Sequence, residues 1–255
     1  MQKTYLVLFP GAWGNRTEEI VRWWFQWVIR FFVDRISPGN LVIVPLTYHG
    51  DSLIDFAVAA ERQLRQVTIP PESKIIAVGY SMGGVVLHLV AAILETKGKR
   101  GFDRVVPIAS CGPKSMRTIG FLRGYRAITL AFTIGAFLGK VTLTKIEEVY
   151  RVFFNTSSRN LAFDELCRRV LEHSHPESFW ACLQLAVWPF RLEKTPPLKI
   201  RVDMILSESD ILFRDELDRR STGGEDWNII KVKGGHGAIL DRDAMFAALN
   251  QINFD

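Results

Sequence analysis

The residues of this chain with the clearest capacity for covalent chemistry are one serine, one aspartate and one histidine. Ser81 lies in Gly-Tyr-Ser-Met-Gly (79–83), between a β-branched apolar run and an apolar helical pattern. A serine hydroxyl is a weak nucleophile until a base takes its proton, and a carboxylate that fixes the tautomer improves that base. Asp210 and His236 each follow a strand-like run. These three residue types predict nucleophilic attack by Ser81, with His236 as base and Asp210 as orienting acid.

The tight turn around Ser81 supports this interpretation. A strand that passes directly into a helix leaves no room for side chains two residues away, and glycines stand at both of those positions, Gly79 and Gly83. The turn strains the backbone of the serine and lifts its hydroxyl above the end of a sheet. A strand-to-helix turn with an incidental serine is the alternative.

Other carboxylates and histidines compete for the two supporting roles. Glu208 and Asp215 flank Asp210, which we prefer because it lies just past the strand in a Ser-Glu-Ser-Asp turn. His236 lies between glycines after the last strand, a position that suits a mobile base. The remaining histidines are assigned to a loop, a helix and an inserted segment: His49, His88, His173 and His175.

Acyl transfer also needs N–H donors directed at the developing oxyanion. The N–H of Met82, in the first turn of the helix after Ser81, is one candidate. The loop Pro-Gly-Ala-Trp-Gly (10–14) follows the first strand, and its Gly11 permits close backbone approach. We therefore predict that the N–H of Ala12 is the second donor and that Trp13 lines the pocket. A plain glycine turn is the alternative interpretation of this loop.

The elements that must position these residues alternate along the chain. Apolar, β-branched runs predict strands at 5–9, 41–46, 74–79, 105–109, 200–206 and 227–233. Amphipathic or apolar patterns with capping signals predict helices at about 17–36, 53–67, 82–96 and 241–251. This order predicts an α/β fold with a mostly parallel, doubly wound sheet of about six strands, covered on both faces.

The predicted helix at 17–36 is unusually aromatic. Its large rings are Trp23, Trp24, Phe25, Trp27, Phe31 and Phe32, and they cover more than one stripe of the helix. Part of this surface must therefore meet something besides the sheet. We favour packing in the core over contact with the inserted segment, a second subunit or a membrane.

Residues 112–196 interrupt the alternation. They contain helical patterns without a convincing strand and exceed the length of an ordinary crossover. We predict an inserted α-helical cap here, with the α/β core formed by 1–111 and 197–255. An apolar run at 127–139 is too short to span a bilayer. The predicted pocket residues are Trp13, Tyr80, Phe132, Phe137 and Trp180, and their apolar character favours a lipophilic substrate, although packing within the cap explains the cap's aromatic residues equally well.

Together, the serine turn, Asp210, Gly-His-Gly at 235–237 and the loop Phe-Pro-Gly-Ala-Trp at 9–13 resemble the α/β-hydrolase superfamily, in its branch of serine hydrolases with a helical cap. The chain order of serine, acid and histidine matches that family. Pro10-Gly11 replaces the more usual His-Gly, as in some thioesterase-like members. The resemblance implies hydrolysis through an acyl-enzyme, with no metal and no organic cofactor.

Composition limits the partners and the compartment. The 255 residues are 48% hydrophobic with a formal charge of +5, and the basic residues are scattered rather than clustered. This pattern argues against nucleic acid as a partner. Three cysteines without paired spacing, Cys111, Cys167 and Cys182, favour a reducing compartment, and the apolar run at 5–9 is too short for a signal peptide. We predict a cytoplasmic protein; the oligomeric state is left open.

Three functions are carried forward from the sequence. The first is hydrolysis of a hydrophobic carboxylic ester, with a small lipophilic ester as substrate. The second is a thioesterase or acyltransferase that uses the same three residues. The third is a lipid-binding protein at the membrane surface with weak catalysis, for which the aromatic helix and the apolar run at 127–139 are the motivation.

Overall fold

The computed structural model describes residues 2–11, 17–50, 52–110, 200–210 and 227–254. The predicted cap, residues 112–196, lies outside the described residues, and so do its boundaries with the core. Ala12 and Trp13 also lie outside them.

Six parallel strands form one sheet with the order β2-β1-β3-β4-β5-β6. The strands are β1 (Thr4–Phe9), β2 (Leu41–Pro45), β3 (Lys74–Tyr80), β4 (Arg104–Ile108), β5 (Val202–Ser207) and β6 (Trp227–Val232). The predicted parallel sheet of about six strands is confirmed. Because β1 lies between β2 and β3, the direction of winding reverses there, and the carboxyl ends of β1 and β3 meet at the switch point where such sheets bind ligands.

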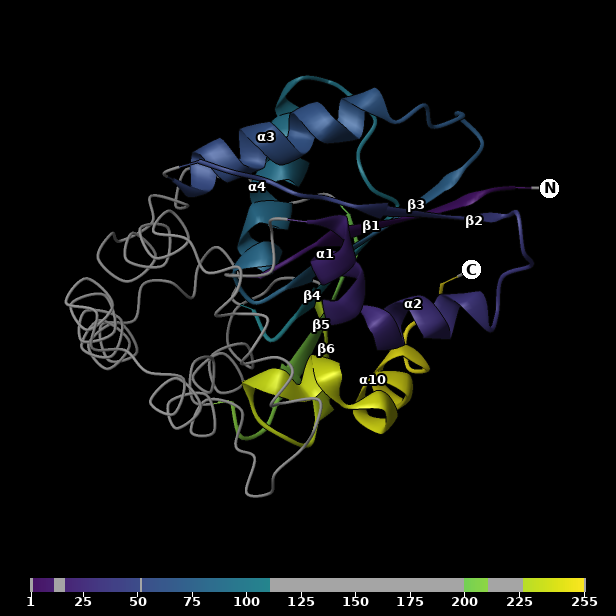
Figure 1. Ribbon diagram of the computed structural model, residues 1–255, viewed down its shortest axis with the longest axis vertical. Helices are drawn as coiled ribbons and strands as arrows, with labels where there is room; N and C mark the ends of the chain where they lie inside the picture. Colours follow the sequence, from purple (N-terminus) through teal and green to yellow (C-terminus); the bar gives the residue numbers. More distant parts are fainter. Residues whose placement is uncertain (1, 12–16, 51, 111–199, 211–226, 255) are drawn as a thin grey trace.

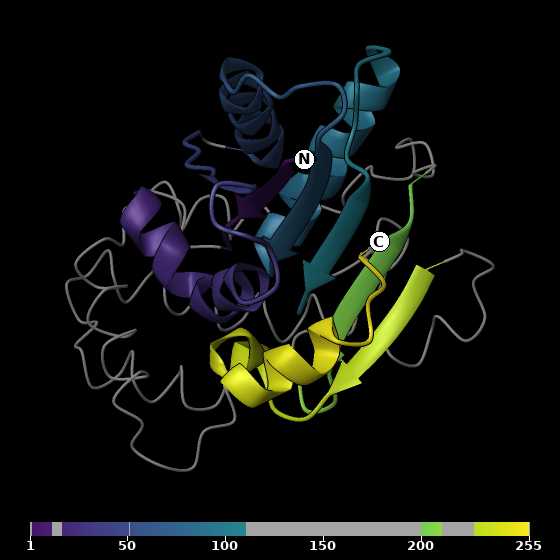
Figure 2. The ribbon, with the colours of Figure 1, turned by 90° about the vertical axis from the view of Figure 1, so that its right-hand side faces the viewer.

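Helices cover both faces of the sheet, as predicted for a doubly wound fold. One face carries α3 (Leu53–Gln66) and α4 (Met82–Thr96), and the other carries α1 (Glu18–Trp24), α2 (Gln26–Val33) and α10 (Arg242–Leu249) (Figure 1). Alternate strand residues serve the two layers: Leu6 and Leu8 face α1 and α2, whereas Val7 and Phe9 face α3 and α4. In Figure 2, α2 and α10 lie side by side although they come from opposite ends of the chain.

The aromatic segment at 17–36 forms two helices instead of the single helix that we predict from the sequence. Phe25 lies at the junction with φ −96° and ψ 17°, outside the helical region. One straight helix buries only one stripe of side chains, so the break lets both segments direct rings into the same core. Thr17 caps the first helix by accepting a hydrogen bond from the N–H of Ile20.

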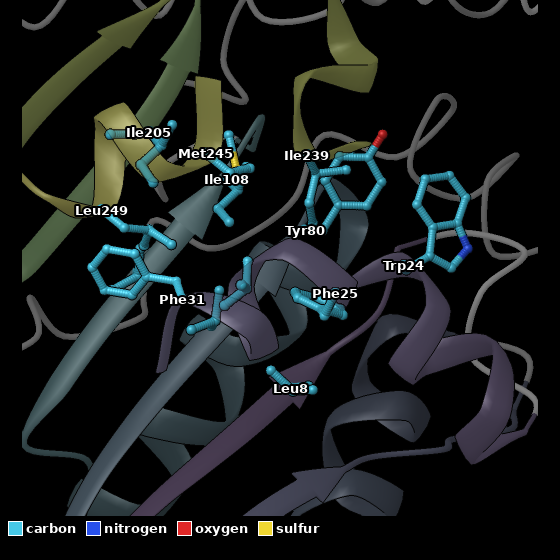
Figure 3. Packing of buried hydrophobic residues seen from close by; sticks show 14 of the residues in the cluster. Leu8, Trp24, Phe25, Phe31, Tyr80, Ile108, Ile205, Ile239, Met245 and Leu249 are labelled. Atoms are coloured by element: carbon cyan, nitrogen blue, oxygen red, sulfur yellow. The ribbon is translucent and has the colours of Figure 1, made fainter. Parts of the chain in front are cut away.

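The large rings of this segment lie in the core. Four of them are 3% exposed or less: Trp24, Phe25, Phe31 and Phe32. Figure 3 shows Trp24, Phe25 and Phe31 packed among residues of β3, β4, β5 and α10. The preferred interpretation, core packing, is therefore confirmed for these residues. Trp23 and Trp27 are partly buried and pack against the same core, and the run at 127–139 lies outside the described residues, so contact with a membrane stays a prediction.

Candidate active site

Ser81 occupies a strained turn between β3 and α4. Its backbone has φ 52° and ψ −123°, a conformation that costs a non-glycine residue about 1–3 kcal/mol. Two neighbours hold it there: the N–H of Ser81 donates to the carbonyl of Ile108 at 2.9 Å, and its carbonyl accepts from the hydroxyl of Ser110 at 2.7 Å. The end of β4 thus fixes the turn from the side.

The glycines on either side of Ser81 are required by close backbone contacts. A Cβ on Gly79 would lie 2.7 Å from the carbonyl oxygen of Gly83. A Cβ on Gly83 would collide with the carbonyl oxygens of Phe9 and Pro10. The second contact shows that the start of α4 rests directly against the loop that follows β1.

Ser81, Asp210 and His236 come together at the carboxyl ends of β3, β5 and β6. The Nδ1 of His236 lies 2.9 Å from Oδ2 of Asp210, and its Nε2 lies 2.9 Å from Oγ of Ser81. A carboxylate only accepts, so the ring proton is on Nδ1 and Nε2 is left to accept the serine hydroxyl. Asp210 is 1% exposed and His236 is 6% exposed, which limits competition from water for both hydrogen bonds.

The competing residues that the structure describes lie elsewhere. Glu208 is exposed, and its backbone N–H continues the β5–β6 contact by donating to the carbonyl of Val232 at 2.9 Å. His49 is exposed on the loop after β2. His88 is buried on α4, where its Nδ1 lies 2.7 Å from the carbonyl of Gly84 and its ring stacks on Trp227. Asp215, His173 and His175 lie outside the described residues.

The predicted oxyanion loop is described as far as Gly11. Met82 is the first residue of α4, so its N–H has no partner within the helix. A Cβ on Gly11 would lie 3.1 Å from the carbonyl oxygen of Tyr80 and 3.2 Å from Cβ of Ser81, so the loop passes beside the serine. These contacts bring the loop and the start of α4 to the same side of Ser81.

Two residues that support this region are absent from the sequence-based prediction of the site. The hydroxyl of Tyr48, a fully buried side chain, donates to the carbonyl of Pro10. Burial raises the pKa of Tyr48 well above its ordinary value, which keeps this donor protonated. Ser110 follows Ala109, which has a positive φ of 45°, and holds the carbonyl of Ser81. Neither stands in a recognisable motif; the signal for Tyr48 is its position just past the end of a strand.

Tyr80, one of the predicted pocket residues, lies in the core within the described residues. It is 3% exposed, because its side chain points into the layer formed by α1, α2 and α10. Its hydroxyl donates to the backbone carbonyl of His236 at 3.1 Å. The other predicted pocket residues, Trp13, Phe132, Phe137 and Trp180, lie outside the described residues.

Among the described residues, no group of three or more histidine, cysteine, aspartate or glutamate side chains is arranged to hold a metal ion. No helix within the described ranges is long and apolar enough to cross a membrane.

Solved structures with the same architecture include enzymes of several activities. A thioesterase, RedJ, from the prodiginine pathway of Streptomyces coelicolor is 18% identical, with a TM-score of 0.64, over 98% of this chain and 86% of that one. The 2-hydroxy-6-oxo-6-phenylhexa-2,4-dienoate hydrolase of Rhodococcus sp. strain RHA1 is 17% identical, with a TM-score of 0.67, over 98% of this chain and 90% of that one. An esterase of Exiguobacterium antarcticum is 13% identical, with a TM-score of 0.64, over 98% and 91%. At these identities the likeness establishes the fold.

A search of curated proteins gives no match to this chain. The model of a family described as the alpha/beta hydrolase family matches residues 6–249, which include all six strands except the first two residues of β1. The fold, the chain order of the three site residues and this match agree. The chain belongs to the alpha/beta hydrolase family.

Proposed function

We propose that this protein is a serine hydrolase that cleaves a carboxylic ester of a hydrophobic substrate through an acyl-enzyme. The observation that carries the proposal is the continuous pair of 2.9 Å contacts from Ser81 through His236 to Asp210. A buried carboxylate, an imidazole and a hydroxyl on a strained turn form the arrangement that activates a serine nucleophile.

In the first half of the proposed reaction, Oγ of Ser81 attacks the ester carbonyl carbon while its proton passes to Nε2 of His236. Asp210 accepts from Nδ1–H and stabilises the imidazolium that forms. The N–H groups of Met82 and, in our proposal, Ala12 stabilise the negative oxygen of the tetrahedral intermediate. The intermediate then collapses, the bond to the alcohol oxygen breaks, and the proton on Nε2 goes to the departing alcohol.

In the second half, water takes the place of the alcohol. Nε2 of His236 accepts a proton from the water as the water oxygen attacks the acyl carbon on Ser81. Collapse of this second intermediate returns the proton to Oγ and releases the carboxylic acid. One ester and one water thus give one acid and one alcohol, and the enzyme is regenerated.

The nucleophile assignment is tested with Ser81→Ala on a panel of p-nitrophenyl esters of increasing chain length. We expect kcat to fall about 10⁴-fold or more, because the variant has no atom that can form the acyl-enzyme. Ser73→Ala is the control: Ser73 is buried, whereas Ser81 is partly exposed, and it lies just before β3, at the opposite end of the strand. Equal turnover in Ser81→Ala and wild type would defeat the proposal.

Thioester hydrolysis is the second candidate. The Pro10-Gly11 sequence of the loop supports it, and RedJ, one of the similar structures, is a thioesterase. The two candidates share Ser81 and differ in the leaving group. Rates on a p-nitrophenyl ester and a coenzyme A thioester with the same acyl chain separate them: a kcat/KM more than tenfold higher for the thioester would favour the second candidate.

A further inference from the structure

The turn that carries His236 is anchored at both of its ends by side chains from other elements. This short 3-10 helix, η4 (His236–Leu240), begins at His236 itself. The carbonyl of His236 accepts from the hydroxyl of Tyr80, on β3, at 3.1 Å. The carbonyl of Leu240 accepts from Nε1–H of Trp27, on α2, at 3.0 Å.

Ile239 is buried in the core, and the N–H of Ser209 donates to the carbonyl of Gly234 at 3.0 Å, but the backbone next to His236 itself is glycine-rich. Glycines stand at 234, 235 and 237, so three of the four residues around His236 carry no side chain that could pack, and Gly234 has a positive φ of 110°. Glycine-rich backbone is conformationally permissive. His236 must nevertheless keep two hydrogen bonds at once, and their geometry depends on where this backbone lies.

Tyr80 contacts the base in a second way. Its ring lies 5.3 Å from the imidazole of His236 and 5.1 Å from the ring of Trp24, centroid to centroid. Figure 3 shows Tyr80 with Trp24 on one side and Ile239, a residue of η4, on the other. Burial, with a further contribution from the negative charge of Asp210, raises the pKa of Tyr80 well above its ordinary value, so its hydroxyl remains a donor.

We propose that Tyr80 and Trp27 are positioning residues that hold the η4 turn so that His236 meets Ser81 and Asp210 simultaneously. The proposal rests on the proposed hydrolytic function for its consequence in catalysis. Tyr80 acts through the backbone of His236, and Trp27 acts through the far end of the same turn. A displacement of a catalytic group by about 1 Å can cost about 100-fold in rate, so loss of one of these two side-chain anchors has a measurable effect.

The experiment compares Tyr80→Phe with Tyr5→Phe. The hydroxyl of Tyr5 donates to the carbonyl of Thr68 at 3.2 Å, so both substitutions remove a tyrosine hydroxyl that donates to a backbone carbonyl. Both also leave a buried ring in place. Tyr5 lies on β1 and packs in the other layer. We expect kcat for a p-nitrophenyl ester to fall about tenfold in Tyr80→Phe with KM within about twofold of wild type, and to be unchanged in Tyr5→Phe.

A second readout needs no substrate. The proton on Nδ1 of His236, which is held against Asp210, is followed by its downfield ¹H NMR signal in wild type and in both variants. We expect the signal to broaden or shift in Tyr80→Phe and in Trp27→Phe, and to persist in Tyr5→Phe. Melting temperatures record any general loss of stability, which we expect to be similar in Tyr80→Phe and Tyr5→Phe.

The outcomes separate this inference from the proposed function. If turnover depends on Ser81 but Tyr80→Phe retains the wild-type kcat and the wild-type signal, the positioning role is wrong and the hydrolase assignment stands. If Ser81→Ala keeps full turnover, the hydrolase assignment is wrong, and the NMR comparison still decides whether Tyr80 holds the imidazole. Equal losses of kcat in Tyr80→Phe and Tyr5→Phe would overturn the inference, because they would indicate a general effect on folding.

Discussion

At the scale of single residues, the chemistry of the site depends on which carboxylate meets Nδ1 of His236. Glu208 and Asp210 are two residues apart, yet Glu208 is exposed whereas Asp210 is 1% exposed. The backbone explains the difference: Glu208 continues the pairing of β5 with β6, and the N–H of Asp210 turns back to donate to the carbonyl of Ser207 at 3.2 Å. The turn directs Asp210 inward, toward the imidazole.

Replacement of Asp210 by asparagine tests this pairing. The amide can donate to the imidazole and so favours the tautomer in which Nε2 carries the proton and cannot accept one from Ser81. We expect kcat to fall about 10⁴-fold, as for the equivalent change in a well-studied serine protease, with little change in fold. Glu208→Gln is the control and should retain the wild-type kcat. Activity lost in Glu208→Gln and kept in Asp210→Asn would reverse the assignment of the acid. Rates of hydrolysis of one p-nitrophenyl ester measure kcat, and circular dichroism of each variant checks that the fold is kept.

Residue chemistry accounts for what the sequence could and could not predict about the site. Ser81, Asp210 and His236 are recognisable because each combines a reactive side chain with a position just past a strand. Tyr48 and Ser110 also lie just past strands, but their contacts and that of Tyr80 cannot be predicted, because each depends on a backbone carbonyl from a distant segment. A local pattern carries no information about which carbonyl a buried hydroxyl will meet.

At the scale of elements, the strands and most helix ends could be predicted because their signals are local. The apolar β-branched runs and the glycines around Ser81 act within a few residues. The same is true of the helix cap that the structure shows at Ser52, whose side chain accepts from the N–H of Asp55. The break at Phe25 is different. It exists because two groups of rings must enter one core against β3, β4 and α10, and that demand appears only after the chain has folded. The strand order is a tertiary property in the same sense.

Gly83 joins two elements, and its replacement by alanine should separate them. The added methyl group would collide with the carbonyl oxygens of Phe9 and Pro10, so α4 and the end of β1 could not keep their present contact. We expect the free energy of unfolding to fall by about 1–3 kcal/mol and esterase activity to be lost, because the same shift displaces Ser81 from His236. Gly101→Ala is the control, since a Cβ there meets nothing within 4 Å. Urea denaturation measures the first effect. A Gly83→Ala protein with wild-type stability and activity would contradict this account of the close contact.

At the scale of the whole molecule, the two ends of the sheet serve different purposes. The carboxyl ends of the strands bring together Ser81, Asp210 and His236, together with strained backbone and glycine-rich turns. The opposite end holds a buried ionic contact: Arg104, at the start of β4, lies 2.6 Å from Oδ2 of Asp203, near the start of β5. Asn228, on β6, donates to the other oxygen of Asp203 at 2.9 Å, and Arg104 and Lys74 also donate to the carbonyls of Asn253 and Phe254. This cluster ties the last residues of the chain to the four neighbouring strands β3, β4, β5 and β6.

This division of roles predicts that stability and activity can be changed separately. In Asp203→Asn the guanidinium of Arg104, 7% exposed as a residue, loses its buried countercharge, and loss of one partner of such a pair costs about 3–5 kcal/mol. We expect the free energy of unfolding in urea to fall by about that amount, while kcat measured well below the new melting temperature stays within about twofold of wild type, because the substitution lies at the far end of the strands from Ser81. Asp34→Asn removes an exposed pair with Arg30, 2.9 Å apart, and should cost less than about 0.5 kcal/mol. A large fall in kcat for Asp203→Asn at a temperature where the variant is fully folded would show that the two ends of the sheet are coupled.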